Sequence, residues 1–298
     1  MKQLFIVAAI ALFASCSNHI IPSTTPIVNT EIKNESNQTI LVGKGSIQIL
    51  QTQPYKEWYD KNFNAYTIDT ATINQLQKIN SNITMEIFLG TWCGDSKREV
   101  PRMLKVLQAA NFDTSKVHLI FVDNSTPTYK QSPQHEERNK FIHHVPTFIV
   151  YENNKELNRI VESPTVSLEK DLQLIVNNKK YTPNYTALLQ WQKQKGVNTK
   201  MSEEALQQLA TELKPICKHT GEFNALGYVR MAQKKYNQAL NIFKLNTYLY
   251  PTSAGTFDSL AEAYYTIGNK ELAKTNYEKV LVINPKDENA KKMLEKLK

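Results

Sequence analysis

Two short apolar runs separated by one helical stretch constrain the fold of this chain more than any other feature of its sequence. The runs span residues 84–89 and 117–122, a length typical of strands buried inside a sheet. A crossover helix that joins two neighbouring strands makes the second strand run parallel to the first. The sequence therefore predicts a strand, a helix and a parallel strand. The apolar residues between the two runs recur at helical spacing, at Val100, Met103, Leu104 and Leu107.

The neighbouring segments extend this unit to an α/β domain between residues 39 and 179. Pro146 opens a further apolar strand, and Asn153-Asn154 turns that strand back as an antiparallel hairpin. Ser167 is placed to cap a last helix. In chain order we predict a strand at 46–50, helices at 54–66 and 70–79, a short helix near 136–141, strands at 147–151 and 156–161, and a helix at 168–175.

A cysteine lies at the corner where the first predicted strand meets the crossover helix, in Trp92-Cys93-Gly94-Asp95-Ser96. The thiolate is the nucleophile in thiol chemistry, and the unpaired N–H groups at a helix start stabilise an anion. Lys97 and Arg98 add positive charge one turn later. Trp92 would shield one flank of the sulfur, and Asp95 either tunes the site electrostatically or caps the helix. We therefore predict that Cys93 is a reactive thiol.

This element order, with Cys93 at the corner and Val145-Pro146-Thr147 before an apolar strand, resembles the thioredoxin superfamily. The resemblance covers about half the chain, from 39 to 178, and implies a central mixed sheet flanked by helices. It implies that Pro146 is cis and lies against Cys93, and that the backbone of Val145 pairs with a thiol substrate. The alternative is a proline that merely starts an edge strand.

The sequence departs from the thioredoxin pattern at the second redox position. The family's pair is Cys-x-x-Cys, and here Ser96 replaces the second cysteine. Without a resolving thiol, Cys93 cannot close the usual internal disulfide. A monothiol site can still form a mixed disulfide and return it to another thiol, and Ser96 could hydrogen-bond the thiolate.

Proton transfer at this site needs a group other than the usual one. The resemblance places a buried acid six residues before the first cysteine, and Ile87 stands there instead. His144, two residues before Pro146, is the best candidate for this role. Its alternative is an exposed loop histidine, which the sequence favours.

Cys217 is a second thiol in the folded part of the chain. A buried, unreactive cysteine is the common case, and we favour it over a disulfide with Cys93. A zinc site is disfavoured, because Cys217 and His219 are two ligands without a second pair at usable spacing. We expect no cofactor and no metal.

Beyond Tyr181 the strand signals stop, and residues repeat at an offset of 34. This period resembles that of tetratricopeptide repeats, although Arg230 stands where an aromatic residue is usual. We predict connecting helices over 180–219 and an all-α repeat domain with a closing helix over 220–298. The resemblance implies a partner protein or peptide on the concave face; a stack that only packs against the first domain is the alternative. The repeating pairs are Phe223 and Phe257, Leu226 and Leu260, Gly227 and Ala261, Ala239 and Ala273, Phe243 and Tyr277, and Pro251 and Pro285.

Residues 1–16 read as an export signal, with Lys2 before an apolar stretch that ends in small residues. Phe13-Ala14-Ser15-Cys16 resembles the bacterial lipobox, which implies acylation of Cys16; ordinary signal cleavage nearby is the alternative. Residues 17–38 are polar and read as a flexible tether. We therefore expect a lipoprotein of the bacterial cell envelope that faces the periplasm, held at the membrane by its lipid.

The formal charge of +8 does not indicate a nucleic-acid partner, because the lysines are scattered over solvated helix faces. Two functions remain. The first is monothiol thiol–disulfide exchange, of a redox or isomerase type, on protein thiols or disulfides recruited in part by the repeats. The second is a non-catalytic scaffold that uses a redox-inactive thioredoxin fold and its repeats for binding.

Overall fold

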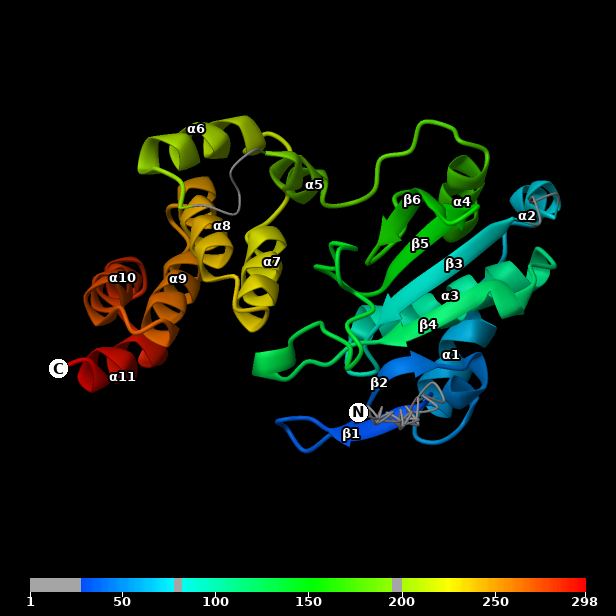
Figure 1. The fold of residues 1–298 in the computed structure, drawn as a ribbon, viewed down its shortest axis with the longest axis horizontal. Coiled ribbons are helices and arrows are strands. Elements are labelled where there is room, and N and C mark those ends of the chain that lie inside the picture. The colour runs from blue at the N-terminus through cyan, green and yellow to red at the C-terminus, as the bar shows by residue number, and fades with distance from the viewer. Residues whose placement is uncertain (1–27, 78–81, 195–199) are drawn as a thin grey trace, which may run out of the picture.

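The structure is a computed structural model that describes residues 28–77, 82–194 and 200–298. These residues form an α/β domain followed by an all-helical domain, as predicted (Figure 1). The predicted signal peptide and the lipidation site Cys16 lie outside the described residues. Within the described ranges, no helix has both the length and the apolar character needed to cross a membrane.

A mixed sheet forms the centre of the first domain, with strand order β1-β2-β4-β3-β5-β6. β3 and β4 are parallel, with Ile87 opposite Leu119, and the helix between them is α3. The predicted crossover unit is therefore confirmed. β5 and β6 form the predicted antiparallel hairpin, with positive φ at both Asn153 and Asn154. The strands are β1 (Thr30–Lys33), β2 (Thr39–Gly45), β3 (Ile83–Leu89), β4 (Val117–Phe121), β5 (Thr147–Glu152) and β6 (Lys155–Val161).

The helices of this domain also follow the predicted order. α4 begins after Ser167, whose side chain accepts a hydrogen bond from the Lys170 N–H as a cap. The α-helices are α1 (Lys56–Ala65), α2 (Thr70–Leu76), α3 (Gly94–Ala109) and α4 (Leu168–Val176), and the 3-10 helices are η1 (Ile47–Gln51), η2 (Thr114–Lys116) and η3 (Thr126–Thr128).

The start of the domain differs from the prediction. The predicted strand at 46–50 is the 3-10 helix η1, and the preceding Thr39–Gly45 is the strand that enters the sheet. The tether does not extend to Gln38, because β1 pairs with β2 over Thr30–Lys33. β1 is an edge strand with one apolar residue, Ile32, so its place depends on backbone pairing that a hydrophobic pattern does not reveal.

The predicted short helix near 136–141 is also absent from the structure. This stretch is a series of turns, and its backbone φ is positive at His135, Asn139 and Phe141. A right-handed helix cannot continue through such residues.

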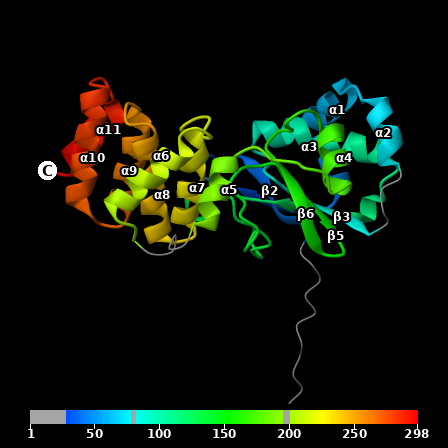
Figure 2. The ribbon, with the colours of Figure 1, turned by 90° about the horizontal axis from the view of Figure 1, so that it is seen from above.

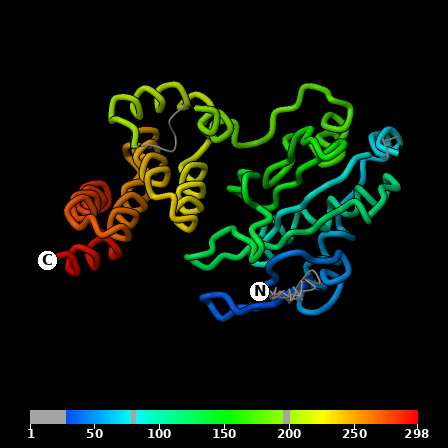
Figure 3. The backbone as a smooth tube through the Cα atoms, in the orientation of Figure 1, coloured from blue at the N-terminus to red at the C-terminus, as the bar shows by residue number. Residues whose placement is uncertain are grey.

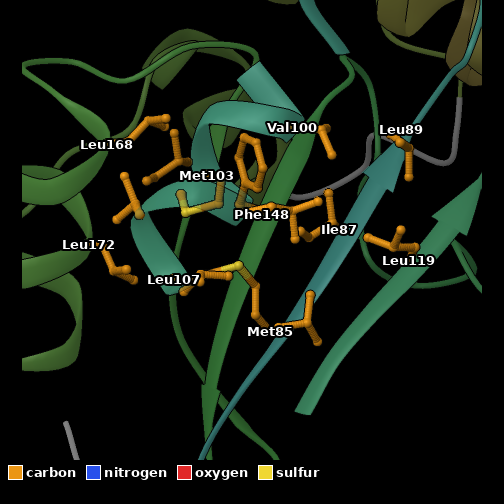
Figure 4. Packing of buried hydrophobic residues seen from close by; sticks show 14 of the residues in the cluster. Met85, Ile87, Leu89, Val100, Met103, Leu107, Leu119, Phe148, Leu168 and Leu172 are labelled. Atoms are coloured by element: carbon orange, nitrogen blue, oxygen red, sulfur yellow. The ribbon is translucent and has the colours of Figure 1, made fainter. Parts of the chain in front are cut away.

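One face of the sheet carries the main core of the domain. Residues that alternate along β3 point into it, and they meet the apolar side of α3 and the first turns of α4 (Figure 4). All of these side chains are buried. They include Met85, Ile87 and Leu89 of β3, Val100, Met103 and Leu107 of α3, Leu119 of β4, Phe148 of β5, and Leu168 and Leu172 of α4.

The opposite face of the sheet carries a smaller cluster, around Phe88, Ile120 and Ile149. Ile142 and Val145, from the segment that precedes β5, pack on this face, and Trp92 and Cys93 lie at its edge. The segment between β4 and β5 thus takes the place of a covering helix. Its final residues lead directly into the site described below.

The helical domain contains two pairs of helices at the predicted offset. Gly227 on α7 permits a close approach, since a Cβ atom there would lie 2.4 Å from Cε1 of Phe243 on α8. On α6 the predicted apolar face is buried at Leu206, whereas Ile216 lies beyond the helix and is exposed. The helices are α5 (Thr186–Lys193), α6 (Glu203–Leu213), α7 (Gly221–Ala232), α8 (Tyr236–Leu249), α9 (Ala254–Thr266), α10 (Lys270–Ile283) and α11 (Glu288–Lys296).

The two domains lie side by side and are joined through α5 (Figure 2). Figure 3 follows the backbone from α4 along an extended connection to this helix. Phe141 and Val161 of the α/β domain belong to the same buried cluster as Trp191 of α5 and Phe223 of α7. The connection is therefore part of a shared apolar interface.

Candidate active site

Cys93 is the N-cap residue of α3, at the end of the loop that leaves β3. Its backbone N–H donates to the carbonyl of Gly90 at 2.9 Å, which fixes the corner between strand and helix. The side chain is partly exposed, and its thiol donates to the carbonyl oxygen of Val145 across a 3.2 Å separation. Cys93 is thus a free thiol at a helix start, against the loop that precedes β5.

That loop has the backbone form that the thioredoxin resemblance implies. The Val145–Pro146 peptide bond is cis. The hydroxyl of Thr147 donates to the His144 carbonyl at 2.7 Å, and the N–H of Glu162 donates to the Pro146 carbonyl at 2.7 Å. The structure therefore brings Cys93, Val145 and Pro146 together and anchors the loop from both sides.

Ser96 lies in the first turn of α3, three residues after Cys93. It is buried, and its hydroxyl accepts a hydrogen bond from the Gly90 N–H at 3.2 Å. This contact holds the residue after β3 against the first turn of α3. A hydrogen bond from this hydroxyl to the Cys93 thiolate stays a prediction.

Trp92 packs beside the corner. Its indole N–H donates to the Val122 carbonyl at 2.8 Å, and its ring lies 6.3 Å from that of Tyr129, centroid to centroid. A Cβ atom on Gly90 would collide with this ring, so the glycine leaves the space that Trp92 fills. Gly94, the first residue of α3, is exposed and has open space around it, which keeps the approach to Cys93 clear.

The charges near the helix start largely compensate one another. Asp95 does not cap the helix; its carboxylate binds the guanidinium of Arg98 at 2.6 Å. Arg98 also binds the buried Glu99 at 2.6 Å, so its positive charge is offset twice. Lys97 is partly exposed, and its N–H donates to the Cys93 carbonyl at 3.0 Å within the first turn.

His144 is not the exposed loop histidine that the sequence favoured. It is buried, its ring stacks on Tyr185 at 4.0 Å, and its Nδ1 lies 2.7 Å from Nδ1 of His143. Burial lowers the pKa of both histidines well below 6.5, and nearby positive groups, among them Lys130, add to the effect. Both rings are therefore neutral near pH 7, and one must donate a proton to the other along the Nδ1 contact.

Two residues that the sequence did not single out complete this side of the site. The hydroxyl of Tyr185 donates a short hydrogen bond to the carboxylate of Glu162. Burial raises the pKa of Glu162, the bond from Tyr185 opposes the shift, and the charge of Asp95 adds to it. Tyr185 thus joins the Glu162 carboxyl to the ring of His144, on the loop that faces Cys93.

Cys217 is a second free thiol, packed against the cluster shared by the two domains. Burial raises the pKa of its thiol to about 12, and the charge of Glu222 acts in the same direction. Such a group is almost entirely protonated at neutral pH, so Cys217 has the character of an unreactive thiol although it is partly exposed. Within the described ranges, no three His, Cys, Asp or Glu side chains are grouped to hold a metal ion.

The helical domain carries a cavity of about 420 Å³ between α6, α8, α9 and α10. The carboxylate of Glu203 on α6 reaches into its lining, where it binds the Lys244 ammonium and the Tyr248 hydroxyl. Phe257 and Tyr264 supply aromatic walls.

Comparisons with known proteins support one of the two resemblances. A thioredoxin family model matches residues 48–171, so this segment is a thioredoxin-like domain. A search of the curated proteins finds no match. Among solved structures the chain resembles PcrH from Pseudomonas aeruginosa, with a TM-score of 0.26 and 18% identity over 38% of this chain and 87% of that one. It also resembles PcrH in complex with the chaperone binding region of PopB, with a TM-score of 0.24 and 16% identity over the same shares.

Proposed function

We propose that this protein performs monothiol thiol–disulfide exchange on partner proteins through Cys93, in its thioredoxin-like domain. The observation that carries the proposal is the position of the Cys93 sulfur, partly exposed at the start of α3 and 3.2 Å from the Val145 carbonyl. A partner strand that pairs with the backbone of Val145 would bring its own sulfur to the same place. The backbone before the cis Pro146 thus orients the substrate, and Cys93 reacts with it.

The exchange needs no external oxidant. The Cys93 thiolate attacks one sulfur of a partner's disulfide, that S–S bond breaks, and a new S–S bond joins Cys93 to the partner. The released thiolate takes up a proton. A second thiol, from the same partner or another protein, then attacks the mixed disulfide and frees Cys93. The sum is a rearranged disulfide, with no net oxidation or reduction of the enzyme.

The groups around Pro146 determine how the proton is handled. His144 is neutral and buried, so it can accept a proton only at a cost. Glu162 has a carboxyl group with a raised pKa, its backbone N–H binds the Pro146 carbonyl, and Tyr185 links the carboxyl to His144. The raised pKa makes the Glu162 carboxylate a stronger candidate for the proton acceptor than the histidine that the sequence indicated.

We propose further that the helical repeats are tetratricopeptide repeats that bind a partner protein. The 34-residue offset and the close contact at Gly227 support this reading. The cavity next to Glu203 is the candidate binding surface. From the N-terminal sequence, we propose that the protein is exported, lipidated at Cys16 and held on the periplasmic side of the cell envelope.

Mixed disulfides recovered from cells test the proposed chemistry. Cells expressing the native chain should show partners linked to it on non-reducing gels, and Cys93→Ser should abolish these species. Cys217→Ser is the matched control, because it removes the unreactive thiol and should leave the pattern unchanged. Loss of the adducts in Cys217→Ser, or their persistence in Cys93→Ser, would contradict the proposal.

A non-catalytic scaffold is the second candidate, and the position of Ser96 favours it. Ser96 stands where the thioredoxin pattern has its second cysteine, so this position gives Cys93 no resolving thiol. In this case Cys93→Ser would leave the partners recovered by affinity purification unchanged. Partners that depend on the cavity at Glu203 but not on Cys93 would identify this function.

A further inference from the structure

A polar cavity of about 640 Å³ lies where the two domains meet, away from Cys93. The turns that precede β5 line it on one side, through residues such as Gln131 and Phe141. The end of α7 and the start of α8 line it on the other, and Trp191 contributes from α5. The cavity therefore depends on both domains being present.

Four cationic side chains line this cavity, from two different domains. Arg138 comes from the thioredoxin-like domain, and Arg230, Lys234 and Lys235 come from the helical domain. The lining holds one carboxylate, Glu137. That carboxylate is 4% exposed and already binds His135 at 3.2 Å. It also accepts hydrogen bonds from the N–H and the hydroxyl of Ser132, at 3.0 and 2.6 Å.

The cations of the cavity have no anionic partner in the described part of the chain. None of the four takes part in an ion pair there. Arg230 is held in place, with its Nη1 donating to Gln233 at 2.7 Å and its guanidinium 5.6 Å from the centre of the Phe141 ring. Its Nε atom is nevertheless buried without an acceptor.

A second donor of the lining is unsatisfied in the same way. The indole N–H of Trp191 is buried and has no hydrogen-bond partner, although the residue is 1% exposed. Unpaired buried donors are rare and costly, so two of them on one cavity point to a missing acceptor. Burial lowers the pKa of Arg230, and burial with the charges of Arg230 and Arg138 lowers that of Lys235. A bound anion would reverse both shifts.

We propose that this cavity binds a small organic anion that carries at least two negative charges on phosphate or carboxylate oxygens. The guanidinium groups match such oxygens in pairs, and the two lysines add charge at the rim. The volume is that of an ordinary small-molecule site. Gln131 and Gln192 supply amide groups for neutral parts of the ligand. This site is independent of the thiol chemistry proposed above, because no residue of its lining belongs to the Cys93 site.

Calorimetric titration of the full chain tests this proposal with two probes at constant ionic strength. Pyrophosphate represents phosphate oxygens, and citrate represents carboxylate oxygens, with chloride as the background anion. We expect at least one probe to bind with a Kd below about 1 mM. Binding of pyrophosphate alone assigns the site to phosphate compounds, and binding of citrate alone assigns it to carboxylates. Failure of both probes to bind would overturn the proposal.

Variants locate the binding. Arg230→Gln and Lys235→Gln should each weaken it at least tenfold, because each removes one of the converging charges. Lys292→Gln, on the exposed face of α11, is the control and should bind as the native chain does. Arg230→Gln also removes the contact between the guanidinium and the Phe141 ring, which could disturb the fold. Lys235 makes no such contact, so Lys235→Gln tests the charge alone. Unchanged affinity in the folded variants would show that the anion binds elsewhere and would overturn the assignment.

Discussion

The sulfur of Cys93 lies 3.2 Å from the carbonyl oxygen of Val145, and the thiol donates a hydrogen bond to it. A thiolate has no proton to donate, so deprotonation breaks this contact and frees the carbonyl. The same carbonyl is then available to a partner strand. The relationship joins the thiol to the backbone that we propose as the substrate-binding segment, and the predictions below follow from the groups around it.

The two free thiols in the described part of the chain, Cys93 and Cys217, should differ strongly in reactivity. The pKa of Cys217 is raised to about 12, so its thiolate is about one molecule in ten thousand at pH 8. We expect iodoacetamide to alkylate Cys93 at least tenfold faster than Cys217, as measured by mass spectrometry of peptides. Denatured protein is the control, in which the two rates should converge. Equal rates in the folded protein would contradict the proposed role of Cys93.

A cysteine at position 96 should restore a dithiol site. Ser96 is buried in the first turn of α3, three residues after Cys93, and residues at this helical spacing lie within bridging range. We expect Ser96→Cys to form an internal disulfide on oxidation, detected as a loss of two free thiols. Ser96→Ala, which also removes the hydroxyl, should form none. Continued alkylation of both position 93 and position 96 in oxidised Ser96→Cys would show that the geometry is unsuitable.

Stability should fall as the pH drops below about 6.5, because of His143 and His144. Their pKa values are lowered well below 6.5 in the folded chain, so below that pH the unfolded chain binds more protons than the folded one. Each histidine can remove up to about 1.4 kcal/mol per pH unit in this range. Glu162, whose pKa is raised, acts in the opposite direction as it takes up its proton.

Urea unfolding between pH 7 and pH 5 measures this loss. We expect the double variant His143→Asn and His144→Asn to flatten the pH dependence. His118→Asn, at an exposed position on β4, should leave it unchanged. An equally steep dependence in the double variant would assign the effect to other groups.

Removal of the Glu162 charge should alter the reactivity of Cys93. A carboxylate beside the Pro146 loop disfavours a nearby thiolate, so Glu162→Gln should raise the alkylation rate of Cys93 above the pKa of this carboxyl. Thiol–disulfide exchange with a partner should slow, because the proton acceptor is lost. Glu57→Gln, exposed on α1, is the control. Parallel changes in the two rates would contradict a role in proton transfer.

The close contact between α7 and α8 should tolerate no added atoms. A Cβ at Gly227 would lie 2.4 Å from Phe243, so Gly227→Ala should destabilise the chain by about 1–3 kcal/mol. Gly255, exposed on α9 with no atom nearer than 4.0 Å, is the matched control. Gly255→Ala should stabilise its helix by about 0.5–1 kcal/mol. Thermal unfolding measures both changes. A lower Tm for Gly227→Ala and a higher Tm for Gly255→Ala would confirm the packing of the repeat.

The sequence predicted the elements that hydrophobic periodicity defines. The crossover unit around α3, the hairpin at Asn153-Asn154 and the helix pairs at a 34-residue offset are all present. β1 was missed, since it is a polar edge strand held by backbone pairing. The turns around His135 were missed as well, because positive φ at non-glycine residues leaves no periodic signal.

The sequence predicted the site residues that belong to linear motifs, but not those that only the fold brings to the site. Cys93 and Pro146 come from motifs, whereas Glu162 and Tyr185 join them only through the folded structure. One signal for Glu162 was available in the sequence. A hairpin that turns at Asn153-Asn154 pairs Pro146 with a residue at the end of β6, either Val161 or Glu162. The bulge in the hairpin shifts the register by one residue and selects Glu162. No comparable signal exists for Tyr185, which reaches His144 from beyond α4.

Tyr185, described above as the link between Glu162 and His144, also bears on how the protein can be divided. A fragment that stops after α4 would lose this ring and expose Phe141 and Val161, which are buried against the helical domain. His144 would gain water and with it an ordinary affinity for protons. The thioredoxin-like half of this chain therefore cannot be separated at a conventional boundary after α4, because Tyr185, which keeps His144 buried, lies beyond it.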